Sequence, residues 1–268
     1  MDAMQQAAIE VEGLSKRYGE VIAVDDVSFS VQHATTTGLL GGNGAGKTTT
    51  LSMLVGLLLP TAGRIRVLGE DMLRHRFRVL ARMNYSSPYV DLPHRLTVWE
   101  NLRVYAGLYG IPRSRERIDA LAAELNFAAL LKRPYGSLSA GQKTRVALAK
   151  ALLNEPEVLL MDEPTASLDP DMADYVRNYL KSYQRRTGAT MLLASHNMTE
   201  VERICDDVII LREGRRVTQG APDALIARYG RQTLEDVFID IARRRRRGAE
   251  DDVPPGLPPA VEQREAAP

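Results

Sequence analysis

The sequence predicts an α/β protein in which helices flank a mostly parallel sheet. Three observations support this prediction. Residues 158–161 form a continuous apolar run, which is typical of a parallel strand buried on both faces. A glycine-rich turn follows the strand expected at 35–40 and precedes the helix expected at 48–59. Residues 96–109 and 114–131 have helical patterns with no clear strand between them, so a helical insertion is expected.

The composition is that of an ordinary globular protein. Of 268 residues, 44% are hydrophobic and 26% charged, enough for one or two domains with a sizeable core. Lys and Arg number 35 against 34 Asp and Glu, and a net charge of +1 argues against nucleic-acid binding driven by overall charge. The single cysteine, Cys205, excludes a disulfide framework and a cysteine-based zinc site, and it suits a reducing cytosol. No apolar stretch approaches the roughly 20 residues of a membrane span, and the N-terminus does not resemble a secretory signal.

The N-terminal part has the alternating pattern of half-buried strands. Ile9 and Val11 alternate with glutamates, and residues 27–31 and 63–68 repeat the pattern. We therefore expect an antiparallel sheet over 8–31 and 63–68, packed beside the parallel sheet. The helix over 48–59 is expected to end before Pro60.

The α/β pattern resumes after the insertion. The expected elements are a helix over 171–186, strands over 190–194, 208–211 and 216–219, and a final helix over 233–247. The core is thus expected at about 8–85 and 155–230, with a helical subdomain at about 86–154, all in a single domain of residues 1–247. Residues 248–268 contain five prolines and few large apolar groups, so they are predicted to be disordered. The arginines at 243–247 either form a solvated helix end or contact anionic lipid headgroups.

A phosphate-binding loop connects the third strand to its helix. Glycines let backbone N–H groups close around a phosphate, and the helix that begins at Lys47 directs its partial positive charge to the same place. Lys47 is expected to reach the β- and γ-phosphates of a nucleotide and Thr48 to ligate Mg²⁺, with Thr49 beside them. The residues that match the pattern G-x-x-x-x-G-K-[ST] are Gly41, Gly42, Asn43, Gly44, Ala45, Gly46, Lys47 and Thr48.

Two acidic residues follow the buried strand over 158–161. A nucleotidase with this loop needs a carboxylate on a neighbouring strand to hold Mg²⁺, and Asp162 stands at the carboxyl end, where ligands bind in open α/β sheets. Glu163 comes next and is placed to polarise an attacking water as general base. The alternative for Glu163 is a solvated acid at a strand end.

A third motif precedes the helix expected over 143–153. In Leu138-Ser139-Ala140-Gly141-Gln142, Ser139 is a typical N-cap, which alone marks an ordinary helix start. Together with the two motifs above, it resembles the nucleotide-binding subunits of ATP-binding cassette (ABC) transporters over about residues 8–230. The motif of that family is Leu-Ser-Gly-Gly-Gln, so Ala140 departs from it while Ser139, Gly141 and Gln142 are kept.

The resemblance implies a P-loop NTPase fold, with a RecA-like sheet, an antiparallel β subdomain and an inserted helical subdomain. It also implies that the third motif binds the γ-phosphate of ATP held by another protomer. Two ATP molecules are then enclosed in a head-to-tail dimer. A helix N-terminus directed at an anion gives this arrangement a physical basis.

Three further positions match the family. Tyr18 resembles the aromatic residue that stacks on adenine, although a core tyrosine is the alternative. Asp169, in Ser167-Leu168-Asp169, resembles the loop that crosses the dimer interface. His196 follows an expected strand and resembles the switch histidine that contacts the γ-phosphate.

One position departs from the family. A glutamine that senses Mg²⁺ or the attacking water normally precedes the helical subdomain, and counting back from residues 96–102 places Pro88 there. Proline has no side-chain donor or acceptor. Either Ser87 or a water replaces the glutamine, or coupling to the permease is altered.

The resemblance implies an ATP-hydrolysing subunit that powers transport through a separate membrane permease by ATP-driven dimer closure. Its expected cofactors are ATP and Mg²⁺, and its expected partners are the permease and a second copy of the chain, with no direct nucleic acid. It is expected on the cytoplasmic side of the membrane, bound through the permease. Residues 233–239 are similar to the ends of cassettes that serve small exporters, which favours export.

Two alternatives remain open. A soluble ABC ATPase acting on nucleic acid or the ribosome would carry two cassettes or a long coiled-coil or zinc insertion, and none separates Lys47 from Ser139. A regulatory cassette with little hydrolysis is suggested by the missing glutamine. The intact Glu163, Ser139 and His196 argue against it.

Overall fold

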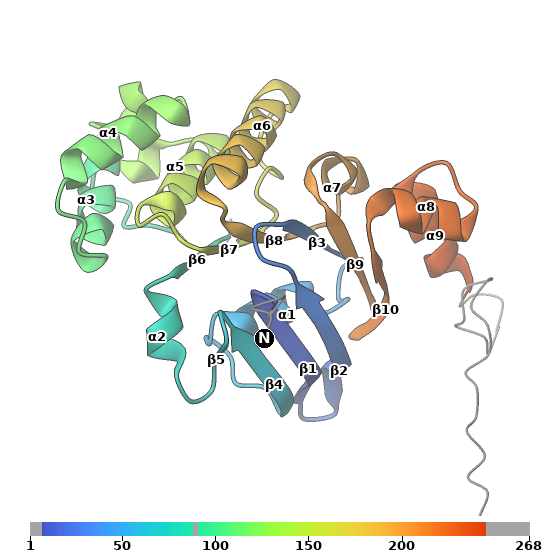
Figure 1. The fold of residues 1–268 in the computed structure, drawn as a ribbon. Helices are drawn as coiled ribbons and strands as arrows, with labels where there is room; N and C mark the ends of the chain where they lie inside the picture. Colours follow the sequence, from blue (N-terminus) through green and yellow to red (C-terminus); the bar gives the residue numbers. More distant parts are fainter. Residues whose placement is uncertain (1–6, 88–90, 245–268) are drawn as a thin grey trace, which may run out of the picture.

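The computed structural model arranges the strands in two sheets, and it describes residues 7–87 and 91–244 (Figure 1). The smaller sheet contains β1 (Ile9–Tyr18), β2 (Val21–Val31), β4 (Ala62–Val67) and β5 (Glu70–Asp71). It is antiparallel with the order β2-β1-β4-β5, which confirms the sheet predicted over 8–31 and 63–68.

The larger sheet is mostly parallel, as predicted. It contains β3 (Thr36–Leu40), β6 (Met83–Ser86), β7 (Val158–Asp162), β8 (Thr190–Ser195), β9 (Asp207–Arg212) and β10 (Arg215–Gly220). Its order is β10-β9-β3-β8-β7-β6, and β10 pairs antiparallel with β9 at one edge. Every residue of β3, β7 and β8 is buried, because both faces of the sheet are covered.

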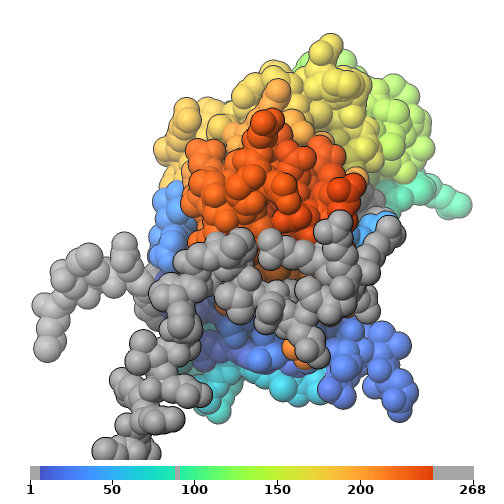
Figure 2. All heavy atoms as spheres, turned by 90° about the vertical axis from the view of Figure 1, so that its right-hand side faces the viewer, coloured from blue at the N-terminus to red at the C-terminus, as the bar shows by residue number. Residues whose placement is uncertain are grey.

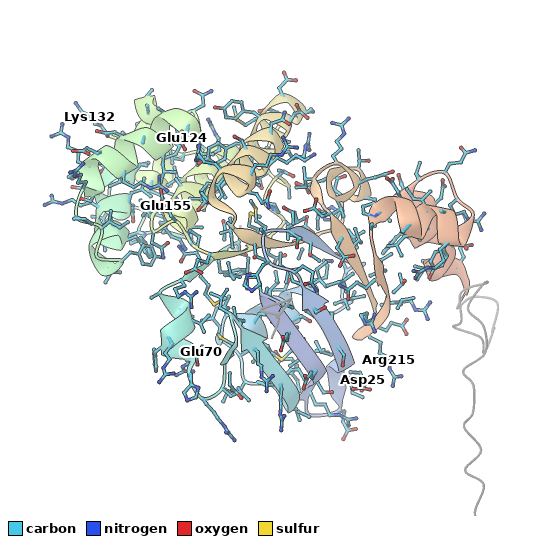
Figure 3. The ribbon with its side chains drawn as sticks, in the orientation of Figure 1. Asp25, Glu70, Glu124, Lys132, Glu155 and Arg215 are labelled. Carbon is cyan, nitrogen blue, oxygen red and sulfur yellow. The ribbon has the colours of Figure 1, made fainter. Side chains whose placement is uncertain are left out.

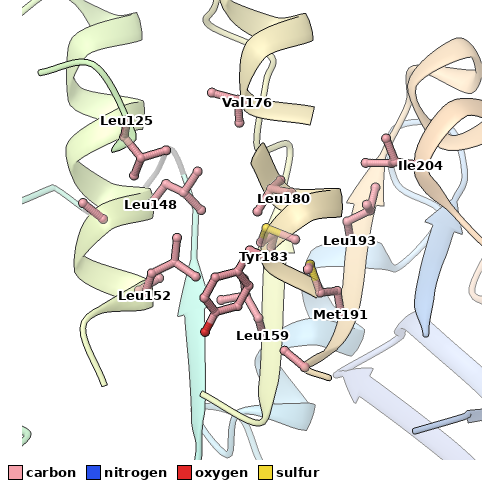
Figure 4. Packing of buried hydrophobic residues seen from close by; sticks show 14 of the residues in the cluster. Leu125, Leu148, Leu152, Leu159, Val176, Leu180, Tyr183, Met191, Leu193 and Ile204 are labelled. Atoms are coloured by element: carbon pink, nitrogen blue, oxygen red, sulfur yellow. The ribbon is translucent and has the colours of Figure 1, made fainter. Parts of the chain in front are cut away.

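Alternate residues of the parallel strands face two separate cores. Val158 and Leu160 of β7 lie in the cluster shared with the antiparallel sheet and α1 (Lys47–Leu54). Leu159 of β7 and Leu193 of β8 face the other way, toward α5 (Ala140–Leu152) and α6 (Pro170–Thr187), as Figure 4 shows. Because successive side chains of a strand point to opposite faces, the same strands pack against the antiparallel sheet and α1 on one side and against α5 and α6 on the other.

Between β6 and β7 the described chain is mainly helical. It contains α3 (Val98–Leu108), α4 (Ser114–Glu124), α5, and short 3₁₀ turns at Ala128–Leu130 and Tyr135–Ser137 (Figure 1). Thr97 begins α3 with a capping box, in which its side chain accepts from the Glu100 N–H while the Glu100 carboxylate accepts from the Thr97 N–H. Glu124 of α4 accepts from the Tyr179 hydroxyl of α6 at 2.8 Å and so ties this segment to the core (Figure 3).

Several helix boundaries differ from the sequence prediction. The helix expected over 114–131 ends at Glu124, because Asn126 adopts a positive φ of 54° that no α-helix continues through. The helix expected over 48–59 ends at Leu54, shortly before Gly56 with φ 71°. The elements that the sequence reasoning missed are β5, β6, α2 (Arg76–Leu80), α7 (Met198–Ile204) and α8 (Pro222–Tyr229).

The C-terminal helices cover one side of the larger sheet. Figure 2 shows α8 and α9 (Leu234–Arg244) on the face toward the viewer. α9 packs against α7 and α8, and Arg212 of β9 donates to the Ile241 carbonyl at 2.8 Å. The helix predicted over 233–247 is thus present as far as Arg244. Residues 245–247 and the tail predicted to be disordered, 248–268, lie outside the described residues.

An ion pair fastens the two sheets to each other. Arg215 of β10 donates through two guanidinium nitrogens to one Asp25 carboxylate oxygen, at 2.6 and 2.9 Å (Figure 3). The Asp25 N–H also donates to the Gly214 carbonyl at 2.8 Å. β2 is therefore held against the β9–β10 hairpin, next to the helix start that follows β3.

Cys205 is buried. In the part of the chain that the structure describes, no helix combines the length and the hydropathy that crossing a membrane requires.

Replacing Leu180 by alanine tests the core on which the helices rest. Leu180 is almost completely buried between α6 and the sheet, so Leu180→Ala is expected to lower the free energy of unfolding by about 2–5 kcal/mol. Leu108→Ala is the matched control, because Leu108 is 74% exposed, and a change within about 0.5 kcal/mol is expected. Urea denaturation of both variants gives the comparison, and equal losses would contradict this assignment of the core.

Candidate active site

The phosphate-binding loop lies between β3 and α1, where the sequence predicted it. Gly46 has a φ of 97°, and a Cβ there would meet the Ala23 carbonyl oxygen at 2.6 Å. A Cβ on Gly41 would meet the Leu211 carbonyl oxygen at 2.8 Å. In contrast, a Cβ on Gly42 or Gly44 would meet nothing within 4 Å. The loop is therefore tight against the protein at its two ends and open along its middle, where a ligand can approach the backbone.

Lys47 places its ammonium group over this loop. The Nζ atom donates to the Gly41 carbonyl at 2.6 Å and the Gly42 carbonyl at 3.2 Å. Burial lowers the pKa of Lys47, while the charges of Glu163 and Asp162 oppose that shift. The lysine is thus a buried cation at the open side of the loop, with acidic groups near it.

Thr48 and Asp162 meet although they come from distant parts of the sequence. The Thr48 hydroxyl donates to Asp162 Oδ2 at 2.9 Å. Asp162 is the last residue of β7 and is buried, and this burial, with the charge of Glu163, raises the pKa of its carboxyl group. The hydrogen bond from Thr48 and the charge of Lys47 oppose the increase.

Glu163 and His196 form the second pair. The His196 Nδ1 atom lies 2.7 Å from Glu163 Oε1, and the two residues follow the adjacent strands β7 and β8. Glu163 has a positive φ of 50°, and its N–H donates to the Ala194 carbonyl at 2.8 Å. This conformation directs the side chain away from the end of β7 and toward the histidine. The His196 side chain is largely exposed, whereas that of Glu163 is mostly covered.

A hollow of about 210 Å³ joins most of these groups. Residues 42–49, Asp162 and Glu163 line it, so the loop, Thr49 and both acids face one space. His196 joins the same site through its contact with Glu163.

The donor set of this hollow fits Mg²⁺. The Thr48 hydroxyl and the Asp162 carboxylate are hard oxygen ligands of the kind that Mg²⁺ prefers. Within the described ranges, no group of three or more His, Cys, Asp or Glu side chains could hold a metal by itself. Such a site suits an ion that keeps several waters and takes its remaining ligands from substrate phosphates.

The third motif does not reach this hollow. Ser139 caps α5, which begins at Ala140 and not at residue 143 as expected, and it forms a capping box with Gln142. Gly141 packs on the turn before α6, where a Cβ would meet the Ser167 carbonyl oxygen at 2.9 Å. Neither Ser139, Gly141 nor Gln142 lines the space around Lys47.

Asp169 and Tyr18 also lie apart from the hollow. Asp169 is the N-cap of α6, and its side chain accepts from the Met172 N–H at 3.0 Å. Tyr18 ends β1 and is 50% exposed, with Lys16 Nζ 5.1 Å from its ring centroid. The alternative of a core tyrosine is therefore wrong. Ser87 is buried, and Pro88 lies outside the described residues.

The sequence reasoning missed Glu200, a buried carboxylate beside the pair of Glu163 and His196. Glu200 is 2% exposed and accepts from the hydroxyls of Thr165 and Ser195. Asn197 and Glu200 have the spacing of a helix N-cap and its third residue, which predicts the start of α7 but not the burial of this acid.

Comparisons with known proteins agree with this geometry. The family model described as ABC transporter matches residues 24–166. The chain is 42% identical over 223 residues to Nod factor export ATP-binding protein I of Ralstonia nicotianae, covering 81% of this chain and 68% of that protein. It is 43% identical over 227 residues to the protein of the same name from Paraburkholderia xenovorans, covering 84% of this chain and 74% of that protein.

Solved structures give the same result. One, described as the ATP binding subunit of an ABC transporter, superimposes with a TM-score of 0.79 at 28% identity, covering 88% of this chain and all of that one. Another is CbiO1 from Clostridium perfringens, part of the ABC transporter complex CbiONQ. It has a TM-score of 0.72 at 29% identity, covering 90% of this chain and 96% of that one. The predicted P-loop NTPase fold is confirmed, and the chain belongs to the ABC transporter family, whose ATP-binding domain it carries.

Proposed function

We propose that this chain hydrolyses ATP to power export of a substrate through a separate membrane permease. The observation that carries the proposal is the convergence of the phosphate loop, Asp162 and Glu163 on one hollow, with His196 in contact with Glu163. The relatives named for Nod factor export support the direction of transport. The substrate is set by the permease partner.

Each group in the hollow has a role that its contacts support. Backbone N–H groups of the loop and the Lys47 ammonium hold the ATP phosphates, and Lys47 leaves its two carbonyl partners to do so. Thr48 and Asp162 would hold Mg²⁺, which when bound neutralises charge on the β- and γ-phosphates. Exposed Tyr18 is available to stack on adenine.

The Glu163–His196 pair supplies the groups for hydrolysis. Glu163 takes the proton from the attacking water as general base. His196, 2.7 Å away, orients that carboxylate and has an exposed ring that can reach the γ-phosphate. Both residues follow buried strands, which fixes their positions before ATP arrives.

A second copy of the chain completes the site. Ser139 and Gly141 stand at a helix N-terminus suited to an anion, yet they lie outside the hollow of their own chain. A head-to-tail dimer brings this helix start over the ATP of the partner copy, and Asp169 lies on the neighbouring turn. ATP binding then favours the closed dimer, and hydrolysis releases it.

Exposed apolar side chains support a membrane partner. Phe77 of α2 is 77% exposed, and Leu73 and Leu57 are also exposed. The segments that carry them are in contact, because a Cβ on Gly56 would lie within 4 Å of Met72 and Arg76. We propose that this surface contacts the cytoplasmic loops of the permease and that the chain acts at the inner face of the membrane.

Two substitutions test the ATPase assignment. Lys47→Ala is expected to abolish ATP binding, because it removes the buried cation at the loop.

Glu163→Gln is expected to bind ATP and to accumulate as an ATP-bound dimer. It is also expected to lower turnover by about 10²–10⁴-fold, the rate factor that a general base usually contributes. Phosphate release and size-exclusion chromatography with ATP measure these effects.

The control for both substitutions is Glu12→Gln, on the exposed side of β1, which is expected to behave as wild type. Tight nucleotide binding by Lys47→Ala would refute the loop assignment. A monomeric Glu163→Gln variant with normal turnover would show that Glu163 is not the base.

A third substitution tests the permease surface. Phe77→Glu is expected to leave basal ATPase activity unchanged and to remove its stimulation by the permease partner, reconstituted in a bilayer. Val21→Glu is the matched control, because Val21 is a similarly exposed apolar residue on the antiparallel sheet. Normal stimulation of the Phe77→Glu variant would place the permease elsewhere.

A further inference from the structure

A buried carboxylate lies directly behind the Glu163–His196 pair. Glu200 belongs to α7 and is 2% exposed. Its Oε1 atom accepts from the Thr165 hydroxyl at 2.6 Å, and its Oε2 atom accepts from the Ser195 hydroxyl at 2.9 Å. Both hydroxyl-bearing residues are themselves buried. Each oxygen of one side chain therefore holds a different loop.

These two loops carry the reacting groups. Thr165 stands two positions after Glu163, and Ser195 stands directly before His196. The His196 Nδ1 and Glu163 Oε1 atoms are 2.7 Å apart. The hydrogen bonds of Glu200 thus close a ring that runs from one member of the pair to the other through the protein interior.

Further hydrogen bonds restrict the motion of the residues in this ring. The Ser195 hydroxyl also accepts from the Asn197 N–H at 3.0 Å, and the Asn197 side chain accepts from the Glu200 N–H at 3.1 Å. The Leu168 N–H donates to the Thr165 carbonyl at 3.0 Å, so the turn that leads to α6 is held as well. The Ser195 hydroxyl and both oxygens of the Glu200 carboxylate therefore all have protein partners.

Burying this acid is unfavourable by itself. Burial raises the pKa of Glu200, and the hydrogen bonds from Thr165 and Ser195 and the charge of Arg177 oppose that increase. Arg177 of α6 is mostly buried and forms an ion pair with Asp174. An apolar residue would fill the same volume without the desolvation cost, so packing alone does not account for an acid at this position.

We propose that Glu200 is a positioning residue that sets the distance and orientation between Glu163 and His196. It acts through its hydrogen bonds to Thr165 and Ser195, without touching the nucleotide. This inference rests on the proposed function, because the pair it positions is the one assigned to hydrolysis. A displacement of about 1 Å at such a pair costs up to about 10²-fold in rate.

The test replaces members of the ring by side chains of similar shape. Glu200→Gln keeps one acceptor oxygen and replaces the other by an amide donor, so one hydroxyl loses its acceptor. It is expected to lower kcat by about 10- to 100-fold, to change the KM for ATP by less than about twofold, and to leave the melting temperature within a few degrees of wild type. Thr165→Val is expected to lower kcat in the same way, and Thr165→Ser to restore it. Glu202→Gln, on the same helix, is the control and is expected to match wild type.

A spectroscopic measurement separates this inference from the proposed function. With ¹⁵N-labelled histidine, the Nδ1 signal of His196, identified by its loss in His196→Gln, reports the contact with Glu163 without any turnover. In Glu200→Gln the signal is expected to move toward that of a histidine without a carboxylate partner, and in Glu202→Gln to stay in place. An unmoved His196 signal with wild-type kcat in Glu200→Gln would overturn the inference. Normal turnover of Glu163→Gln would instead refute the proposed function, whatever the His196 signal shows.

Discussion

The hydrogen bond between Thr48 and Asp162 is the contact on which the rest of the site depends. β8 lies between β3 and β7 in the sheet, so this bond joins the start of α1, which follows β3, to the end of a strand that is not a neighbour of β3. It forms because parallel strands bring their carboxyl ends to one edge, and because all three strands are buried and cannot shift independently. Lys47, Glu163 and His196 take their positions from the same edge.

The antiparallel sheet and the helices between β6 and β7 have different positions relative to this edge. The antiparallel sheet is fixed to the β9–β10 hairpin by Asp25 and Arg215, and the Ala23 carbonyl of β2 lies against Gly46, which supports the loop from behind. The helices between β6 and β7 place the start of α5 against the turn before α6, outside the hollow. A single chain therefore holds the phosphate loop and the helix start at Ser139 apart, and in the proposed function a second copy brings the two together.

The sequence predicted those parts of the site that depend on local chemistry. The loop and the acids after β7 could be located because glycine spacing and a buried apolar strand leave few alternatives. The histidine after β8 was located only through the resemblance to the family. The end of α4 was not foreseen, because a positive φ at Asn126 has only a weak sequence signal. β6 was missed because its four residues are too short for a clear pattern, and its place follows only from pairing with β7. Glu200 was missed because its burial depends on Thr165 and Ser195, which are distant from each other in sequence.

The most direct test of this account is the rate of phosphate release per molecule of purified chain, measured with ATP and Mg²⁺ over a wide range of protein concentrations. A site completed by a second copy predicts a specific activity that rises with concentration and then reaches a plateau when the dimer is fully populated. A specific activity that is substantial and constant down to the lowest concentration would show that one chain is sufficient, and would contradict the role assigned to the helix start at Ser139.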